Sequence, residues 1–167
     1  MLRRIVRGIR RRWNWYRINH TLVGCKKFEK KRKLLIYNGF EIGEGTKIVG
    51  PLECTCKLVI GKYCWIGKNL KVNGNGSVEI GDNCDIAPEV TFQTGGHEIG
   101  DSNRRAGEGK IFHQKVGSGT WIGGRATILN DTQIGQGCVI AGCSCVINNV
   151  PDNVLVGGVP AKIIREL

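Results

Sequence analysis

Apolar residues recur every six positions along most of the chain, from Ile42 onward. Small or β-branched residues follow four places after many of them. A period of six fits neither an α-helix, which repeats about every 3.6 residues, nor an ordinary alternating strand. The apolar row consists of Ile42, Ile48, Cys54, Ile60, Ile66, Val72, Val78, Ile80, Ile86, Phe92, Val116, Ile122, Ile128, Ile134, Ile140 and Val146. The small-residue row consists of Thr46, Cys64, Cys84, Thr120, Ala126, Thr132, Cys138 and Ser144.

This period predicts an all-β triangular solenoid. Each six-residue unit supplies one short strand and one turn, and three units close one coil around the aliphatic side chains. About five coils result, over residues 42–59, 60–77, 80–97, 116–133 and 134–151. Because successive coils lie roughly 4.8 Å apart, as neighbouring strands do, the prism is expected to be about 24 Å tall.

The repeat is interrupted over residues 98–115. Continuing the count past Phe92 would bring Glu98, Arg104 and Lys110 into the core, where unpaired charges are not tolerated. These residues are therefore predicted to leave the solenoid as a protruding loop with a functional role. His97 lies at the mouth of that loop.

The net charge of +11 is concentrated at the start of the chain. Residues 1–33 hold 13 of the 25 Lys and Arg side chains and one of the 14 acids. Apolar residues recur at helical spacing among these basic residues, which predicts a basic amphipathic helix. We therefore divide the chain into an arm over 1–41 and a β-helix domain over 42–167. The helical stripe consists of Leu2, Ile5, Val6, Ile9, Trp13 and Tyr16.

A basic amphipathic helix suits contact with an anionic membrane surface. Alternatively, its stripe packs on the solenoid or on a neighbouring subunit. Nucleic acid also attracts such charge, but no recognition module accompanies it, so no nucleic-acid partner is expected. The first residues lack the apolar run of a secretory signal, and no stretch reaches the ~18 apolar residues of a membrane span. We expect a cytoplasmic protein, peripheral at the inner face of the membrane if the arm binds lipid.

The eight cysteines are explained mainly by the repeat. Cys54 belongs to the apolar row, and Cys64, Cys84 and Cys138 belong to the small-residue row, where a thiol acts as a small hydrophobe. Without an export signal the thiols are expected to be reduced. The C-x-C spacings are poor evidence for zinc, so no metal is expected.

Three segments and the six-residue rows carry a resemblance to a known family. The segments are TGGHEIGDSNRRAGEGKIF, VGSGTWIGGRATILNDTQIGQGCVIAGCS and VPDNVLVGGVPAKIIREL. Together they resemble the hexapeptide-repeat acetyltransferases, closest to the galactoside and maltose O-acetyltransferase branch and to polysaccharide-biosynthesis O-acetyltransferases. The resemblance covers about residues 42–167. It implies a left-handed parallel β-helix, acetyl-CoA as co-substrate, and a homotrimer whose active sites lie between neighbouring subunits.

By this resemblance His97 is the catalytic base, because the family's histidine opens its loop in a matching T-G-H context. By position alone, His97 is also typical of a polar loop residue. The base takes a hydroxyl proton while that oxygen attacks the thioester directly. A main-chain N–H that contacts the acyl group in the family maps to Gly124, where it can stabilise the oxyanion.

The resemblance also implies the path of coenzyme A. Its pantetheine arm is expected along the coils that contain Gly142, Ile147 and Asn148, and its phosphates near Lys162 and Arg165. Relatives often have Thr-Lys where this chain has Ile147 and Asn148, so contacts there would be made by the main chain. Lys162 and Arg165 are also typical of solvated charges in a tail.

Acceptor contacts are expected from Asn73, Asn75 and Trp121. The two asparagines belong to an NGNG segment and are also typical turn residues. Trp121 falls at an outward position of its repeat, where it either borders the acceptor and coenzyme A or packs at a subunit interface.

We therefore expect an O-acetyltransferase that moves acetyl from acetyl-CoA to a hydroxyl of a saccharide acceptor, a surface-polysaccharide precursor. N-acetylation of an amino sugar and a non-catalytic β-helix scaffold remain alternatives. The β-helical carbonic anhydrases are excluded because they need three zinc-binding histidines. The chain has only His20, His97 and His113, and His20 precedes the solenoid.

Overall fold

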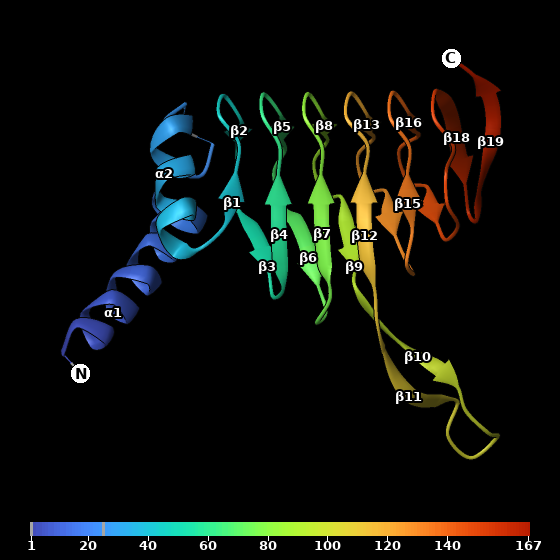
Figure 1. The fold of residues 1–167 in the computed structure, drawn as a ribbon, viewed down its shortest axis with the longest axis horizontal. Coiled ribbons are helices and arrows are strands. Elements are labelled where there is room, and N and C mark those ends of the chain that lie inside the picture. The colour runs from blue at the N-terminus through green and yellow to red at the C-terminus, as the bar shows by residue number, and fades with distance from the viewer. Residues whose placement is uncertain (1, 25) are drawn as a thin grey trace.

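The computed structural model describes residues 2–24 and 26–167. Helices occupy the N-terminal end, and a stack of short strands follows (Figure 1). The helices are α1 (Leu2–Tyr16), a π-helical turn η1 (Arg17–Thr21) and α2 (Phe28–Asn38).

The strands form the three faces of a triangular prism, with parallel pairing from coil to coil. Sheet A contains β1 (Glu41–Ile42), β4 (Lys57–Ile60), β7 (Ser77–Ile80), β12 (His113–Val116) and β15 (Gln133–Ile134). Sheet B contains β2 (Lys47–Ile48), β5 (Trp65–Ile66), β8 (Asp85–Ile86), β13 (Trp121–Ile122), β16 (Val139–Ile140), β18 (Val154–Gly158) and β19 (Ala161–Glu166), of which β19 is antiparallel to β18. Sheet C contains β3 (Leu52–Cys54), β6 (Leu70–Asn73), β9 (Thr91–Gln93), β14 (Thr127–Ile128) and β17 (Cys145–Val146).

The chain visits sheets A, B and C in turn, so every coil has an A–B, a B–C and a C–A corner. The predicted triangular solenoid is thereby confirmed, although the third predicted coil ends before residue 97, because the hairpin begins at Gly95.

Both predicted rows fill the interior of the prism. Every member of the apolar row except the half-buried Cys54 is buried, and so is every member of the small-residue row. The two-residue slip reflects a longer second coil, since Ile60 pairs with Ile80, 20 residues later, whereas Ile42 pairs with Ile60, 18 residues later. The thiols of Cys64, Cys84 and Cys138 are buried among these rows, as predicted.

The predicted loop is a β-hairpin that projects from the C–A corner, away from the prism (Figure 1). It consists of β10 (Gly95–Ile99) and β11 (Ala106–Ile111), which are antiparallel. The predicted bounds of 98–115 are therefore shifted by a few residues. Pairing starts already at Gly95, and the chain rejoins sheet A at His113, which pairs with Ser77.

A buried amide closes the corner from which the hairpin leaves. Gln114 is 1% exposed. Its Nε2 lies 3.1 Å from the carbonyl oxygen of Gln93, 3.1 Å from that of Ile128 and 2.9 Å from that of Asn130. The side chain therefore joins the last strand before the hairpin to the next coil.

The arm consists of two parts with different surroundings. α1 is the predicted basic helix, whereas η1 and α2 cover the first coil. Ile18 and Leu35 are 0% exposed and belong to the solenoid core. Lys31 is also fully buried, and its Nζ donates a hydrogen bond of 2.9 Å to the carbonyl oxygen of Val49. The apolar spacing did not predict that η1 and α2 cover the first coil. The charged residues that precede Leu35 in α2 obscure the periodic pattern of apolar residues that would have indicated a buried helix face.

Leu35→Ala is expected to lower the free energy of unfolding by about 2–5 kcal/mol, because it leaves a cavity under the cap. The matched control is Ile36→Ala on the same helix, at a side chain that is 42% exposed. This control should cost about 0.5 kcal/mol or less. Urea denaturation measures both, and equal losses would show that α2 does not close the core.

Candidate active site

His97 is an exposed residue of β10. Its Nδ1 lies 3.0 Å from the carbonyl oxygen of Gly107 on β11. A carbonyl oxygen can only accept a hydrogen bond, so Nδ1 is the donor. In the neutral ring Nε2 then keeps its lone pair and is the nitrogen that can accept a proton from a substrate.

Two predicted acceptor residues lie at the C–A corner from which the hairpin leaves. Asn73 ends β6, and its carbonyl oxygen accepts hydrogen bonds from the backbone N–H and the hydroxyl of Thr94, at 2.7 and 3.0 Å. The side-chain Oδ1 of Asn73 is buried and accepts no hydrogen bond from the described residues. Asn75 is exposed in the turn that follows.

Two predicted coenzyme A residues lie at the same C–A corner, in the coil nearest the C-terminus. Ile147 and Asn148 follow β17 directly. The carbonyl oxygen of Ile147 accepts a hydrogen bond of 3.0 Å from Nδ2 of Asn130, and Asn148 is exposed. The structure thus brings these two residues to the same edge of the prism as His97.

Gly124 and Gly142 lie instead at the B–C corner, in successive coils. They are stacked, because the N–H of Cys143 donates a hydrogen bond of 2.9 Å to the carbonyl oxygen of Gly124. Among the described residues, neither the N–H of Gly124 nor that of Gly142 has a partner. The equivalent positions of earlier coils hold Gly50, which is buried, Lys68, which has a long side chain, and Pro88, which has no N–H. Among these turns of the described residues, those at Gly124 and Gly142 are therefore the ones that combine an unpaired N–H with an accessible position and no side chain.

The remaining predicted residues lie on sheet B. Trp121 is the outward residue of β13 and is 54% exposed. Lys162 and Arg165 are exposed on β19, where Nη1 of Arg165 donates a hydrogen bond of 3.1 Å to the carbonyl oxygen of Glu166. Both cations therefore lie beyond the coil of Gly142, on the C-terminal side.

Sheet C separates these residues into two groups. His97 lies at the C–A edge of the sheet, whereas Gly124 and Gly142 lie at its B–C edge. The hairpin projects away from the prism instead of folding across sheet C (Figure 1). Within one chain, the base and the free N–H groups therefore do not meet.

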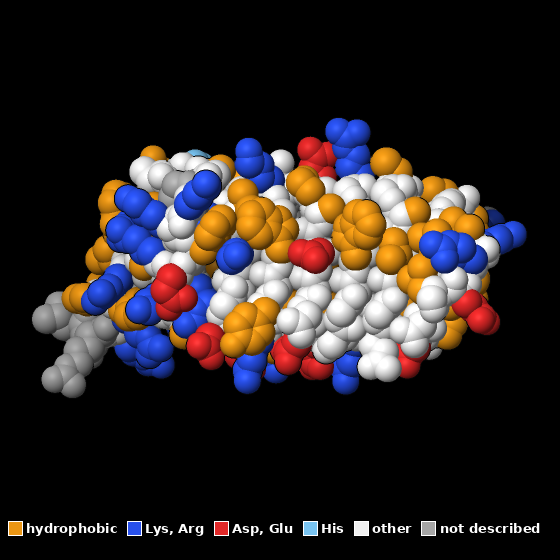
Figure 2. Space-filling model, turned by 90° about the horizontal axis from the view of Figure 1, so that it is seen from above, with side chains coloured by type: hydrophobic (Ala, Val, Ile, Leu, Met, Phe, Trp, Pro, Cys, Tyr) orange, Lys and Arg blue, Asp and Glu red, His pale blue; other side chains and the backbone are white. Residues whose placement is uncertain are grey.

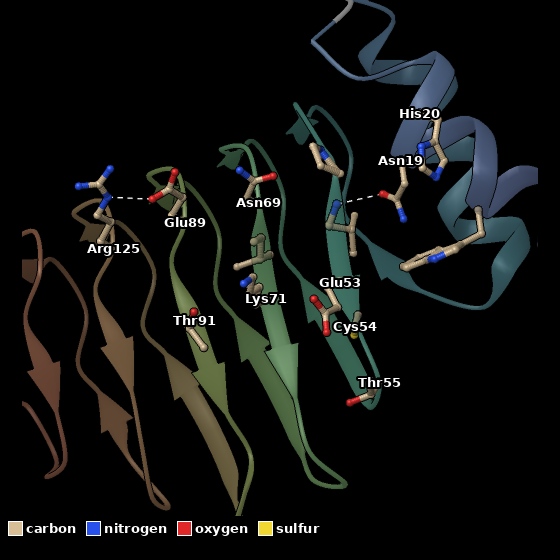
Figure 3. A pocket seen from close by; sticks show the side chains of 14 residues that line it. Asn19, His20, Glu53, Cys54, Thr55, Asn69, Lys71, Glu89, Thr91 and Arg125 are labelled. Atoms are coloured by element: carbon tan, nitrogen blue, oxygen red, sulfur yellow. Dashed lines mark hydrogen bonds and ion pairs between the residues drawn. The ribbon is translucent and has the colours of Figure 1, made fainter.

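A large cavity of about 920 Å³ covers the outer face of sheet C beside the arm (Figure 3). The carboxylate of Glu89 lies 2.8 Å from the guanidinium of Arg125 and raises the pKa of that group. None of the predicted site residues lines this cavity. Sequence reasoning missed it because outward strand positions and an arm give no signal of a shared pocket. Its polar lining includes Asn19, His20, Glu53, Asn69, Lys71 and Thr91.

In the part of the chain that the structure describes, no group of three His, Cys, Asp or Glu side chains is arranged to hold a metal ion.

Comparison with known proteins identifies the family of the chain. Residues 115–148 match the family model described as bacterial transferase hexapeptide (six repeats). The galactoside O-acetyltransferase of Escherichia coli K12 is 32% identical over 154 residues, which cover 91% of this chain and 75% of that protein.

Solved structures agree as well. A galactoside acetyltransferase in complex with coenzyme A superposes with a TM-score of 0.79 at 28% identity, over 96% of this chain and 80% of that one. A hexapeptide-repeat acetyltransferase of Vibrio cholerae O1 biovar eltor, complexed with acetyl coenzyme A, gives 0.78 at 28% identity, over 97% and 87%. The solenoid is therefore a left-handed parallel β-helix, and the chain belongs to the hexapeptide-repeat acetyltransferases and is an acyltransferase.

Proposed function

We propose that the protein transfers the acetyl group of acetyl-CoA to a hydroxyl of a saccharide, with His97 as general base. The observation that carries this proposal is the hydrogen bond from Nδ1 of His97 to the carbonyl oxygen of Gly107. It leaves Nε2 free to accept a proton on an exposed hairpin. Support comes from the similarity to a galactoside O-acetyltransferase and to structures that hold coenzyme A or acetyl coenzyme A.

The reaction proceeds in two proton-coupled steps. Nε2 of His97 takes the hydroxyl proton as the acceptor oxygen attacks the thioester carbonyl carbon. The tetrahedral intermediate carries a negative oxygen, which the unpaired N–H of Gly124 can stabilise. Collapse of the intermediate breaks the carbon–sulfur bond, and the leaving thiolate receives the proton from the imidazolium. No acyl-enzyme is formed, so no nucleophilic cysteine or serine is needed.

Coenzyme A would follow the prism toward its C-terminal end. The N–H of Gly142 in one chain offers a contact to the amide groups of pantetheine. The backbone at Ile147 and Asn148 lies at the opposite edge of sheet C, so it would contribute from the neighbouring chain of the trimer. Lys162 and Arg165 supply exposed cations for the phosphates.

The acceptor is expected to contact Asn73, Asn75 and Trp121, and we propose a surface-polysaccharide precursor as its source. The same base could also deprotonate the attacking amine of an amino sugar, so N-acetylation is the second candidate. The similarity to an O-acetyltransferase over 91% of the chain favours oxygen as the attacking atom. A non-catalytic scaffold is disfavoured because the chain belongs to a family of acetyltransferases.

A homotrimer would complete the site. Because His97 and Gly124 occupy opposite edges of sheet C, a second chain must supply one of them. In a ring of three identical chains the same contact repeats, so that His97 of each chain faces Gly124 of the next.

We further propose that α1 holds the enzyme at the inner, cytoplasmic face of a membrane. Its sequence LRRIVRGIRRRWNWY contains six arginines and no acid. The stripe residues Ile5, Val6, Ile9, Trp13 and Tyr16 are 49–65% exposed, whereas the side chain of Leu2 lies outside the described residues. None of the helices described is both long and apolar enough to cross a bilayer.

The other face of α1 is already occupied. Asn14 is buried, and its Nδ2 donates a hydrogen bond of 3.3 Å to Oδ1 of Asn38 on α2. The guanidinium of Arg10 lies 4.8 Å from the ring centroid of Tyr37. These contacts orient the apolar stripe away from the solenoid, with arginines beside it, as binding to an anionic surface requires.

His97→Ala is expected to lower kcat for acetyl transfer by about 10²–10⁴-fold, the usual loss for a general base, with the Kd for coenzyme A unchanged. His113→Ala is the matched control, because this exposed histidine follows the same hairpin and binds Ser77 instead. Steady-state kinetics at saturating acceptor decide the question, and wild-type turnover in His97→Ala would remove this residue from the mechanism.

Mixing two inactive variants should restore activity if each site is shared. His97→Ala lacks the base and Gly124→Leu blocks the N–H, but every mixed trimer contains one junction at which both groups are intact. An equal mixture, co-folded, should therefore recover about a quarter of wild-type turnover. Absence of recovery, or light scattering that finds an active monomer, would contradict the shared site.

The double variant Ile9→Ser, Trp13→Ser keeps every arginine but removes the centre of the stripe. It should lose sedimentation with vesicles that contain anionic phosphatidylglycerol, while turnover on a soluble acceptor stays the same. Binding of the wild-type protein to these vesicles should weaken as salt is raised from 0.1 to 1 M. Each surface Lys or Arg contributes only about 1 kcal/mol of attraction to the anionic lipid, and salt screens that attraction. The control is Ile36→Ser on α2. A changed oligomeric state in the double variant would instead assign the stripe to a subunit contact.

A further inference from the structure

Three outward side chains on sheet B form a row of which the proposed function uses only Trp121. Trp65 is paired in register with Asp85, and Asp85 with Trp121, on three successive coils. The two indoles are 42% and 54% exposed. In Figure 2, hydrophobic side chains with an acidic group between them run along the middle of the face seen from above. A carboxylate is thus held between two large aromatic groups on the surface of the prism.

This row borders a cavity of about 330 Å³. That volume is at the small end of the range for ligand pockets, which suits a single sugar ring better than an extended ligand. The lining consists of Trp65, Asp85, Ile86, Ala87, Pro88 and Trp121.

The polar side-chain groups of the cavity have no partners among the described residues. The carboxylate of Asp85 takes part there in no hydrogen bond and no ion pair, and neither indole N–H donates a hydrogen bond. The ring of Phe28 packs edge-on against Trp65, with the centroids 5.6 Å apart, and supports that indole from the side of α2. The row therefore offers two exposed indole rings, one of them packed against Phe28, and a carboxylate that can accept hydrogen bonds from a ligand.

These groups match the chemistry of a pyranose. The C–H faces of a sugar ring pack on aromatic rings, and two neighbouring hydroxyls can donate to one carboxylate in charge-assisted hydrogen bonds. A carboxylate or phosphate on the ligand at this point would be repelled by Asp85. The cavity therefore selects a neutral ring.

The cavity adjoins the proposed oxyanion donor. Pro88 lines it, and the carbonyl oxygen of Pro88 lies 3.3 Å from the point that a Cβ on Gly124 would occupy. The row spans the coils on both sides of the position at which the hairpin leaves the prism. In a ring of chains whose axis runs along the prism, a neighbour's His97 would lie at this same height. The larger cavity on sheet C extends instead toward the arm and the first coils.

We infer that Asp85 is the specificity-determining residue of the acceptor site, and that Trp65 and Trp121 form its stacking platform for a neutral pyranose. This inference rests on the proposed acetyl transfer to a saccharide and deepens it. It adds Asp85 and Trp65 to Trp121, the one residue of this row expected from the sequence to contact the acceptor. It also specifies that the acceptor ring is uncharged.

The test compares Asp85→Asn and Asp85→Leu with wild type, on a galactoside and on the matching galacturonide. In both variants KM for the galactoside should rise about 10-fold or more, because two charge-assisted hydrogen bonds are weakened or lost. KM for acetyl-CoA and the slow release of thiol without acceptor should not change. The preference in kcat/KM for galactoside over galacturonide should fall about 10-fold in Asp85→Asn. A merely structural role of Asp85 would not move that preference.

Glu53→Gln is the matched control, because it neutralises a carboxylate in the larger cavity on sheet C. Unchanged KM and unchanged preference in both Asp85 variants, or a shift in Glu53→Gln alone, would overturn the inference. Titration calorimetry with the galactoside separates it from the proposed function. If wild type binds the sugar but acetylates no saccharide, the proposed function fails and the effect of Asp85→Leu on Kd still decides the inference. If wild type binds no pyranoside, the inference fails.

Discussion

Each coil of this protein is held by backbone hydrogen bonds to the coils directly before and after it. The N–H of Gly43 donates to the carbonyl oxygen of Ile60, and the N–H of Gly61 to that of Ile80, both at 2.8 Å. The aliphatic row inside the prism forces every coil into the same register, because a shifted coil would turn its apolar residues outward. The positions of His97, Gly124 and the sheet B row along the axis of the prism therefore all follow from this one repeat.

A stack of this kind has two open ends, and the chain treats them differently. At the N-terminal end Ile18, Lys31 and Leu35 cover the first coil, and the ammonium of Lys31 binds a carbonyl oxygen that no preceding coil could use. At the C-terminal end β19 folds back on β18 as an antiparallel strand. At the N-terminal end α1 remains available for the proposed membrane contact. At the C-terminal end β19 carries Lys162 and Arg165, where the phosphates of coenzyme A are expected.

Much of the fold could be predicted from the sequence because a six-residue period has few physical solutions. The rows, the coils and the excursion after His97 follow from counting apolar positions. α2 could not be found this way, since its burial depends on contact with a coil formed later in the chain. The cavity beside Asp85 was invisible for the same reason, because it joins residues that are neighbours only after the coils have stacked. The hydrogen bond from His97 to Gly107 depends instead on the pairing of β10 with β11, which the apolar count does not predict. The assigned roles of Gly142, Ile147 and Asn148 still rest on resemblance.

The side chain of Gln114 has a consequence for how such enzymes diversify. One amide reaches three carbonyl oxygens on both sides of the hairpin, and the strands that flank the hairpin are already paired with neighbouring coils. The closure of the corner is thus independent of the length and composition of the inserted segment. A hairpin anchored in this way can vary in length, and in its residues other than His97, over evolutionary time while the rest of the prism keeps its shape. The surroundings of the proposed base can therefore change without a new fold, while the row on sheet B stays in place.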